Sequence, residues 1–433
     1  MGYLDPVTER MPQKELRMLQ EKKLRQLMLY LKAHSSFYRK RFKEAGVDFE
    51  DVRTLEDLKK LPFTFKRDFR ENYPVGMFCV PPDRIACYHA SSGTTGKPTI
   101  VGYTRSDVEQ WSTSLARGLT SLGIGRGDLV QNSYGYGLFT GGLGFHYAAE
   151  MVEATILPIG TGGTERQIEF MRDLGSTIIA CTPSYFLHLA EVARGLGVDF
   201  RKDTKLRAGL FGAEPWSEDM RKRIEGSTGI KAYDVYGTSE LGGPLFTECR
   251  FQNGIHVWSD LYIVEIVDPE TGEVLGEGEK GELVATTLSK EALPLVRYRT
   301  GDVTYLNIEE CECGRTHPRI MRIHGRTDDM LVIRGINVFP SQVESVLMRI
   351  PELSENYQLI VDREHELDKM TVRVEVDEKA YKGMTASLDE VRRKAQAALK
   401  NVLNLSVEVE LAEPGSIPRS TGKAKRVIDR RKI

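Results

Sequence analysis

The stretch SSGTTGKPTIVGYT, residues 91–104, places hydroxyl, glycine and lysine residues directly before a short apolar run. Glycines let backbone N–H groups turn inward around an anion, hydroxyls add hydrogen-bond donors, and Lys97 adds a positive charge, which together suit a phosphate. The stretch is not a Walker loop, because Gly93 and Gly96 enclose two residues instead of four and Pro98 follows the lysine. A surface turn rich in serine and threonine has the same composition, so the rest of the sequence must decide.

Length and charge exclude several classes of protein. The 433 residues exceed what one compact domain usually holds, so we expect two or three domains. The 60 lysine and arginine residues are balanced by 62 aspartate and glutamate residues, and the net charge of −2 does not indicate a nucleic-acid-binding protein. No apolar run is long enough to span a bilayer, and the first residues lack the pattern of a signal peptide. We therefore expect a cytoplasmic protein without a membrane partner, and its six cysteines are too few for a disulfide scaffold.

Alternating helical and apolar patterns predict the fold class. The apolar runs indicate βαβ units and a mostly parallel sheet, and they are TIVGY (99–103), DLVQNS (128–133), ATILPIG (154–160), STIIACTPS (176–184), LRAGLFGAEP (206–215) and KAYDVYG (231–237). Before them, residues 12–45 repeat leucine at helical spacing and predict an N-terminal helical region. From about residue 249 to 322, alternating apolar and polar residues with glycine-containing turns predict a hairpin-rich antiparallel subdomain.

A change of pattern near residues 325–328 predicts a domain boundary. The sequence beyond it alternates strand-like runs with two helical stretches, FPSQVESVLMRI and SLDEVRRKAQAALKNVL, which suits a small α+β domain. We therefore expect an α/β protein with a large N-terminal domain over residues 1–325, built from mixed and mostly parallel sheets with the hairpin-rich subdomain. Residues 326–433 are expected to form the C-terminal α+β domain.

Four further stretches are too polar and too rich in glycine for their surroundings. They are GAEP (212–215), YGTSELGGP (236–244), RYRTGD (297–302) with HGRTDD (324–329), and PRSTGK (418–423). Each alone is explained by a turn or a chain end. Together with SSGTTGKP, however, they resemble in order the core motifs of the adenylate-forming superfamily of acyl-CoA synthetases, peptide-synthetase adenylation domains and luciferases. Within this superfamily, YGLFTGGLG and DDMLVIRGINVFPSQVE resemble the phenylacetate-coenzyme A ligases and their aryl-CoA ligase relatives.

The resemblance implies a ligation in two steps. A carboxylate attacks the α-phosphate of ATP to give an acyl adenylate and pyrophosphate, and coenzyme A then displaces AMP to give a thioester. Mg²⁺ is the expected metal, because it takes oxygen ligands and bridges phosphate oxygens. By the same resemblance Lys423 stabilises the charge of the first step, Glu240 holds Mg²⁺, and Ser239 donates to the α-phosphate. The basic tail could instead be solvated, and Lys425 is an alternative to Lys423.

The resemblance also implies contacts with the rest of ATP and with coenzyme A. The β- and γ-phosphates are expected at Ser91, Ser92, Gly93, Thr94, Thr95, Gly96 and Lys97. Adenosine is expected at Gly212, Ala213, Glu214, Pro215, Asp234, Tyr236, Gly237, Asp302 and Arg326. The C-terminal domain is expected to rotate between the two steps about Asp328, and Gly335 to line the coenzyme A tunnel. Gly335 could also be a hairpin glycine, and the two interpretations are compatible.

The acid substrate is the part that the motifs define least. Residues 133–146, SYGYGLFTGGLGFH, combine aromatic residues with glycines, which suits a flat apolar molecule, although such residues are more often part of a core. By the resemblance, the wall of the pocket is expected at Tyr136, Phe139, Ala213, Val235 and Pro244. No arginine lies among these positions to bind a second carboxylate, so a monocarboxylic aryl acid such as phenylacetate is expected.

Two other functions fit the motifs as well. The acyl group could pass to a carrier protein or a sugar amine instead of coenzyme A, or the chain could be a silent nucleotide-binding module. The intact Lys97, Glu240, Asp302 and Lys423 argue against a silent module. A homodimer is compatible with the sequence.

Three cysteines and a histidine form a separate candidate site. Cys249, His256, Cys311 and Cys313 offer three thiolates and an imidazole, a donor set that suits tetrahedral Zn²⁺. The Cys-x-Cys spacing is less diagnostic than Cys-x-x-Cys, and buried free thiols are common. The site is expected to be structural because it is far in sequence from the catalytic motifs, and His317 is an alternative ligand to His256.

Overall fold

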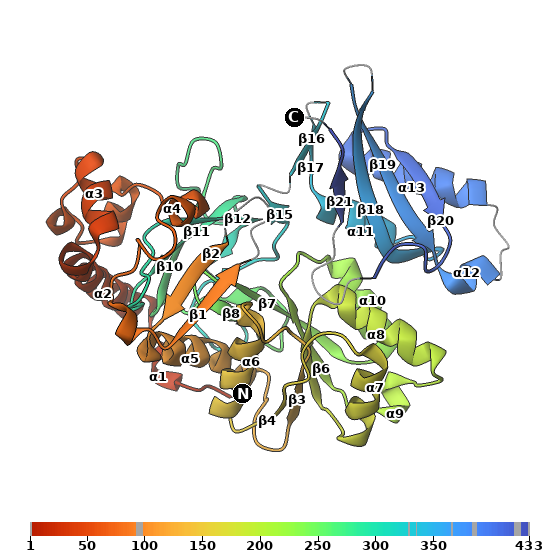
Figure 1. The fold of residues 1–433 in the computed structure, drawn as a ribbon, viewed down its shortest axis with the longest axis horizontal. Helices are drawn as coiled ribbons and strands as arrows, with labels where there is room; N and C mark the ends of the chain where they lie inside the picture. The colour runs from red at the N-terminus through yellow and green to blue at the C-terminus, as the bar shows by residue number, and fades with distance from the viewer. Residues whose placement is uncertain are drawn as a thin grey trace. The chain divides into compact units, whose positions relative to one another are not determined.

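The structure, a computed structural model, describes residues 2–91, 98–327, 330–334, 336–364, 367–382, 388–419 and 426–431. Contacts divide the chain into two compact units, each built from segments that are distant in sequence (Figure 1). Unit 1 comprises Met1–Gly160, Ser176–Ala180 and Tyr233–Arg322. Unit 2 comprises Thr161–Gly175, Cys181–Ala232 and Ile323–Ile433. None of the described helices combines the length and the apolar character that crossing a bilayer requires.

The N-terminal part of unit 1 is helical because its leucines recur on one side. In α2 (Gln13–His34), Leu16, Leu24 and Leu31 are buried. This helix ends before Ser35, whose hydroxyl accepts a hydrogen bond from the backbone N–H of Tyr38 at 3.2 Å and caps α3 (Ser36–Glu44). The expected helical region is therefore two helices. Unit 1 also contains α1 (Pro6–Glu9), α4 (Lys66–Glu71), α5 (Arg105–Ser121), α6 (Thr140–Met151) and 3₁₀ turns at Phe49–Asp51, Leu55–Lys60 and Pro82–Arg84.

The largest sheet has nine strands among the described residues and combines parallel with antiparallel pairs. Its parallel part pairs β3 (Leu129–Asn132) with β4 (Thr155–Leu157) and with β5 (Ile178–Cys181). The antiparallel part runs in order through β7 (Lys231–Thr238), β8 (Gly243–Glu248), β9 (Ile255–His256), β14 (Arg319–Ile320) and β13 (Leu306–Asn307). The remaining strand is β6 (Ala208–Gly212), which is buried along its whole length. The α/β class with a mixed sheet is confirmed.

Two smaller sheets of unit 1 are antiparallel. The first pairs β1 (Cys87–Ser91) with β2 (Thr99–Tyr103), so the expectation that TIVGY belongs to a parallel sheet is wrong. The reason is the connection from Ser91 to Thr99, which is too short for the crossover that a parallel pair needs. The second joins β10 (Tyr262–Val267), β11 (Gly281–Thr287) and β12 (Tyr298–Thr304), as the alternating pattern of this region predicts.

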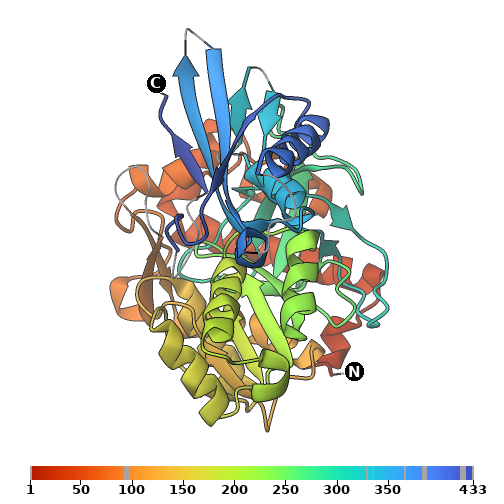
Figure 2. The ribbon, with the colours of Figure 1, turned by 90° about the vertical axis from the view of Figure 1, so that its right-hand side faces the viewer.

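Unit 2 ends in a sheet with its own apolar core. The long hairpin of β18 (Leu353–Glu364) and β19 (Leu367–Val376) is flanked by parallel partners, β21 (Val427–Asp429) on β18 and β20 (Glu408–Ala412) on β19. The helices α11 (Pro340–Met348) and α13 (Leu388–Leu403) pack against this sheet and against each other (Figure 2). The other elements of unit 2 are α7 (Thr164–Asp173), α8 (Pro183–Gly195), α9 (Phe200–Asp203), α10 (Glu218–Thr228), α12 (Glu378–Lys382), β15 (Gly325–Arg326), β16 (Leu331–Ile333) and β17 (Ile336–Val338).

Candidate functional site

The motif YGTSELGGP forms the end of β7, a four-residue turn and the start of β8. We call residues 239–242 the Ser239–Gly242 turn. Gly237 must lack a side chain, because a Cβ atom there would lie 1.6 Å from the carbonyl oxygen of Gly243. Gly243 has φ +84°, a conformation that favours glycine. The glycines of the motif therefore let β7 and β8 approach each other closely enough to form the Ser239–Gly242 turn.

Two polar side chains of this turn are buried, namely Ser239 and Glu240. The hydroxyl of Ser239 lies 3.1 Å from that of Thr140, the first residue of α6. Oε1 of Glu240 is buried and has no hydrogen-bond partner in the described parts of the chain, and its ion pair with Nζ of Lys66 is long, at 3.6 Å. A buried carboxylate oxygen with spare acceptor capacity suits a hard cation such as Mg²⁺. Sequence reasoning missed Lys66, which lies outside the glycine-rich motifs, and it assigned no role to Thr140, although Thr140 lies within the motif YGLFTGGLG.

Tyr236 and Asp302 are in direct contact, although 66 positions separate them. The hydroxyl of Tyr236 on β7 donates to Oδ2 of Asp302 on β12 at 2.7 Å, and both residues are buried. The Tyr236 ring stacks on Phe246 with a centroid distance of 6.3 Å. On the neighbouring strand β8, Glu248 accepts a hydrogen bond from the backbone N–H of Asp234 on β7 at 2.8 Å. The structure thus brings a flat ring and a carboxylate together, as a nucleoside site requires.

The aromatic stretch 133–146 packs beside the Ser239–Gly242 turn. A Cβ atom on Gly144 would lie 2.7 Å from Cγ of Pro244, so α6 approaches β8 closely. The Tyr136 hydroxyl accepts a hydrogen bond from Nδ2 of Asn132 at 2.7 Å, and burial raises the pKa of Tyr136 to about 12. Phe139 is 42% exposed, whereas Val235 on β7 is buried. Four of the five residues expected in the acid pocket therefore belong to unit 1.

The motif GAEP and Arg326 belong to unit 2. Gly212 ends β6, and Ala213 follows it with φ +68°, which is uncommon for a residue other than glycine and is typical of functional turns. Ala213 is exposed, and Pro215 is partly buried. Oε1 of Glu214 accepts a hydrogen bond from the backbone N–H of Ser184 at 2.9 Å and so fixes the turn to α8. Arg326, on β15, is partly exposed.

Several expected site residues lie outside the described part of the chain. Ser91 is described: it ends β1, and its buried hydroxyl has no hydrogen-bond partner in the described ranges. Those that are not described are Ser92, Gly93, Thr94, Thr95, Gly96, Lys97, Asp328, Gly335, Lys423 and Lys425. Their roles stay predictions.

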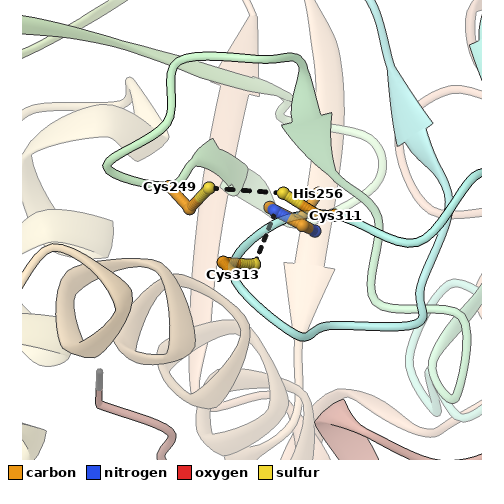
Figure 3. A group of neighbouring side chains, drawn as sticks. All are labelled: Cys249, His256, Cys311 and Cys313. Carbon is orange, nitrogen blue, oxygen red and sulfur yellow. Dashed lines mark hydrogen bonds between the residues drawn. The ribbon is translucent and has the colours of Figure 1, made fainter.

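Figure 3 shows the side chains of Cys249, His256, Cys311 and Cys313 converging in unit 1. All four are buried, and their ligand atoms lie within 4.8 Å of one another. The Sγ atoms of Cys249 and Cys311 are 3.7 Å apart, and Sγ of Cys313 is 3.5 Å from Nε2 of His256. Around tetrahedral Zn²⁺ the corresponding sulfur–sulfur and sulfur–nitrogen separations are about 3.8 and about 3.6 Å. These two separations therefore match the edges of a zinc tetrahedron and are far too long for a disulfide.

The alternative ligand His317 is wrong for this cluster. Nε2 of His317 lies 2.9 Å from the carbonyl oxygen of Thr8, and Nδ1 accepts a hydrogen bond from the backbone N–H of Ser259 at 3.1 Å. Both ring nitrogens are therefore engaged by backbone groups. Burial lowers the pKa of His256 and favours the neutral imidazole that a metal requires.

The loop that carries Cys311 and Cys313 also holds the N-terminus of the chain. The hydroxyl of Tyr3 donates to the carbonyl oxygen of Cys313 at 2.7 Å. Nε of Arg315 donates to Glu9 at 2.7 Å, and both side chains of this ion pair are almost fully buried. Residues after the cysteine pair thus form a docking point for the first turn of the protein, which sequence reasoning did not identify.

Comparisons with known proteins agree with the motifs. Residues 138–288 match the family model described as AMP-binding enzyme, and residues 335–431 match the AMP-binding enzyme C-terminal domain. The chain is 46% identical to the phenylacetate-coenzyme A ligase of Thermus thermophilus, with 99% of each chain covered. It is also 46% identical to that of Escherichia coli, covering 99% of this chain and 98% of the relative.

Solved structures of a CoA ligase resemble this chain over nearly its full length, at lower sequence identity. A 2-hydroxyisobutyryl-CoA ligase in the postadenylation state, in complex with R3-HIB-AMP, superposes with a TM-score of 0.93 at 32% identity, covering 99% of this chain and 92% of that one. The same ligase in complex with 2-HIB-AMP and CoA, in the thioesterification state, gives a TM-score of 0.74 at 33% identity over the same shares. With its full length matched by relatives that are nearly half identical, this chain belongs to the phenylacetate-coenzyme A ligase family of AMP-binding enzymes.

Proposed function

We propose that the protein is an AMP-forming acid–CoA ligase that converts phenylacetate, ATP and coenzyme A to phenylacetyl-CoA, AMP and diphosphate. The observation that supports it best is the full-length identity of 46% to phenylacetate-coenzyme A ligases of four species. The contacts of unit 1 support the same reaction, since Ser239, Glu240, Tyr236 and Asp302 are all buried and lie on the β7–β8 hairpin or on β12.

In the first step a carboxylate oxygen of the acid attacks the α-phosphorus, and pyrophosphate leaves. Ser239 donates a hydrogen bond to the α-phosphate, and Glu240 would hold Mg²⁺ through the oxygen that lacks a hydrogen-bond partner within the described residues. Bound to Glu240, Mg²⁺ would supply positive charge against the phosphate oxygens. Tyr236 packs on adenine, and Asp302 accepts the ribose hydroxyls while Tyr236 fixes its carboxylate. Lys423 stabilises the pentacoordinate phosphorus.

In the second step the coenzyme A thiolate attacks the acyl carbon, and AMP leaves with the bonding electron pair. We assign residues 1–325 to an adenylation domain and residues 326–433 to a domain that rotates about Asp328 between the two steps. Gly335 then lines the path of the thiol. The related 2-hydroxyisobutyryl-CoA ligase has been solved in separate postadenylation and thioesterification states, which supports two steps of this kind.

The acid pocket is proposed at Tyr136, Phe139, Ala213, Val235 and Pro244. Its four members in unit 1 lie just before α6 or on β7 and β8, near the contact between Ser239 and Thr140. A flat aryl acid would place its carboxylate towards these hydroxyls and its ring against the aromatic stretch. Burial of that ring then separates aryl acids from acetate.

A pyrophosphate-release assay tests the proposed function. Phenylacetate, benzoate, indole-3-acetate and acetate are each supplied with Mg·ATP, in the presence and in the absence of coenzyme A. We expect phenylacetate to give the highest kcat/KM, and phenylacetyl-CoA to accumulate only with coenzyme A. Acetate as the preferred acid would refute the aryl pocket, and turnover that depends on an added carrier protein instead of coenzyme A would refute the acceptor.

We further propose a structural Zn²⁺ bound by Cys249, His256, Cys311 and Cys313. The separations of the ligand atoms and the completely buried donor set support it. Metal analysis of protein purified without added metal should give about one zinc per chain. Cys311→Ser should lose the metal and lower the thermal midpoint, whereas Cys79→Ser, which changes a buried thiol outside the cluster, should retain it. Zinc-free protein of unchanged stability would exclude the site.

We also place the protein in the cytoplasm. All six cysteines are free thiols, and the close pair of Cys249 and Cys311 is not joined as a disulfide. Thiols that close together persist in a reducing compartment or on a metal. Fusion to a fluorescent protein and fractionation of the cells test this, with a periplasmic or membrane pool as the contrary result.

A further inference from the structure

Two buried side chains hold the backbone of the Ser239–Gly242 turn from behind. Nζ of Lys290 donates to the carbonyl oxygen of Glu240 at 2.7 Å. The hydroxyl of Tyr103, the last residue of β2, donates to the carbonyl oxygen of Ser239. These carbonyls belong to the two consecutive residues whose side chains are assigned to the α-phosphate and to Mg²⁺. The turn is therefore fixed by two donors that come from distant parts of the sequence.

Burying the ammonium of Lys290 at this position costs free energy, because the charge loses its hydration. Lys290 is 7% exposed, and within the described part of the chain it forms no ion pair. Its ammonium lies 4.6 Å from the centre of the Tyr103 ring, a cation–π contact that compensates part of the lost hydration. Burial lowers the pKa of Lys290 to about 8, which reflects how poorly the ammonium is solvated. The charges of Asp107 and Glu240 favour the ammonium and offset part of this loss of hydration. A side chain needed only to fill space would be apolar, because burying an ammonium destabilises a fold unless its charge and its hydrogen bonds are compensated.

The segment that carries Lys290 is itself held in place. The carboxylate of Asp107, in the first turn of α5, accepts hydrogen bonds from the backbone N–H groups of Glu291 at 2.6 Å and Ala292 at 2.9 Å. It also accepts one from the N–H of Thr104 at 3.0 Å, next to Tyr103. Asp107 therefore fixes both donors of the turn relative to one another. A cavity of about 10 Å³ beside Lys290, Tyr103 and Gly242 leaves room for about one water.

We propose that Lys290 is a positioning residue for adenylation, which together with Tyr103 clamps the Ser239–Glu240 backbone so that hydroxyl and carboxylate stay aligned on Mg·ATP. The proposal rests on the proposed function for the roles of Ser239 and Glu240. The clamp acts through backbone carbonyls and touches neither substrate nor metal. Its removal should therefore impair the use of Mg·ATP and leave acid binding and the thioester step largely unchanged.

The test compares Lys290→Met with a matched control, Lys23→Met. Nζ of Lys23 also donates to a backbone carbonyl oxygen, that of Asp260, at 2.7 Å, and burial lowers its pKa as well. We expect Lys290→Met to lose about tenfold or more in kcat/KM for Mg·ATP in acid-dependent pyrophosphate exchange. The KM for the acid and the rate of thioester formation from supplied acyl adenylate should change less than about threefold. Lys23→Met should change none of the three, even where the thermal midpoints of both variants fall.

Two further variants separate positioning from mere stability. Lys290→Arg keeps a cationic donor and should restore most of the exchange activity, whereas a purely structural role would make the bulkier arginine as harmful as methionine. Tyr103→Phe keeps the ring and deletes only the hydroxyl, and its effect should not add to that of Lys290→Met, because both act on one turn. If Lys290→Met does not fold, Lys290→Arg and Tyr103→Phe decide the question.

The outcomes distinguish this proposal from the proposed function. Calorimetric titration of Mg·ATP into the wild type, Lys290→Met and Lys23→Met requires no acid and no knowledge of the acid. If only Lys290→Met binds Mg·ATP more weakly than the wild type, the clamp is supported. This holds even if the wild type activates no aryl acid and the proposed function is therefore wrong. Equal binding in all three proteins, or an equal loss of both half-reactions in folded Lys290→Met, overturns the clamp while leaving the ligase assignment intact.

Discussion

Deleting the hydroxyl of Tyr236 should weaken the use of ATP by a defined amount. Tyr236→Phe removes the donor that lies 2.7 Å from Oδ2 of Asp302 and keeps the ring stacked on Phe246. A hydrogen bond to a buried carboxylate contributes about 1.5–3 kcal/mol. Because each 1.4 kcal/mol corresponds to a factor of about ten, kcat/KM for Mg·ATP should fall about 10- to 150-fold.

The structure indicates that this loss should depend on the ribose. If Tyr236 acts by fixing the carboxylate that accepts the ribose hydroxyls, the penalty must shrink when one of those hydroxyls is absent. Acid-dependent pyrophosphate exchange is therefore measured with ATP and with 2′-deoxy-ATP at a saturating concentration of acid. The ratio of wild-type to Tyr236→Phe activity should be several-fold smaller with the deoxynucleotide.

A matched variant controls for the general cost of deleting a buried hydroxyl. Tyr38→Phe removes a hydroxyl that lies 3.0 Å from Oγ1 of Thr64 and accepts from the backbone N–H of Val296 at 2.9 Å. It should lower the thermal midpoint without changing the preference between the two nucleotides. Equal penalties for ATP and 2′-deoxy-ATP in Tyr236→Phe would refute the assignment of Asp302 to the ribose, whatever the size of the loss.

Three other substitutions test separate parts of the molecule. Lys423→Ala should abolish acid-dependent pyrophosphate exchange and spare thioester formation from supplied adenylate, and parallel loss of both in folded protein would contradict its role. Glu9→Gln leaves the buried guanidinium of Arg315 without its counterion and should cost about 3–5 kcal/mol in urea unfolding, while a change below about 1 kcal/mol would show that the pair is dispensable. Ala213→Leu should lower kcat/KM for phenylacetate far more than for acetate, and an equal decrease for both acids would place the acid elsewhere.

The sequence predicted the class of fold because the order of its motifs and the periodicity of its strands agree. The runs at 128–133, 154–160 and 176–184 do form the parallel strands β3, β4 and β5. TIVGY has the same apolar character but pairs antiparallel with β1. Apolar composition records that a strand is buried, whereas its direction depends on the length of the connection, here the short segment after Ser91. That length was readable in the sequence, but the partner strand β1 was not identified in it.

The candidate zinc ligands were predicted from residue type, with His256 as the preferred histidine, but residue type alone did not exclude His317. His256 and His317 both lie in the region expected to be rich in hairpins, and both could have reached the three cysteines. The structure separates them by register, because Arg319 pairs with His256 across β14 and β9, whereas His317 lies just before β14. Its ring nitrogens instead contact the carbonyl oxygen of Thr8 and the backbone N–H of Ser259. Such a choice depends on the N-terminal segment docking against the loop, a contact with no local signal in the sequence.

The position of Lys290 could not be predicted from the sequence. Its neighbours Ser289 and Glu291 are polar, and a lysine between them has the appearance of a solvated residue in a loop. Only when β2, α5 and the Ser239–Gly242 turn meet does the ammonium become buried against a carbonyl group. Ser239 and Glu240 could be identified from the motif YGTSELGGP because their side chains are assigned to the α-phosphate and to Mg²⁺. A residue that fixes their backbone from the opposite side carries no such pattern, so its identification depends on finding a buried donor whose burial has no other explanation.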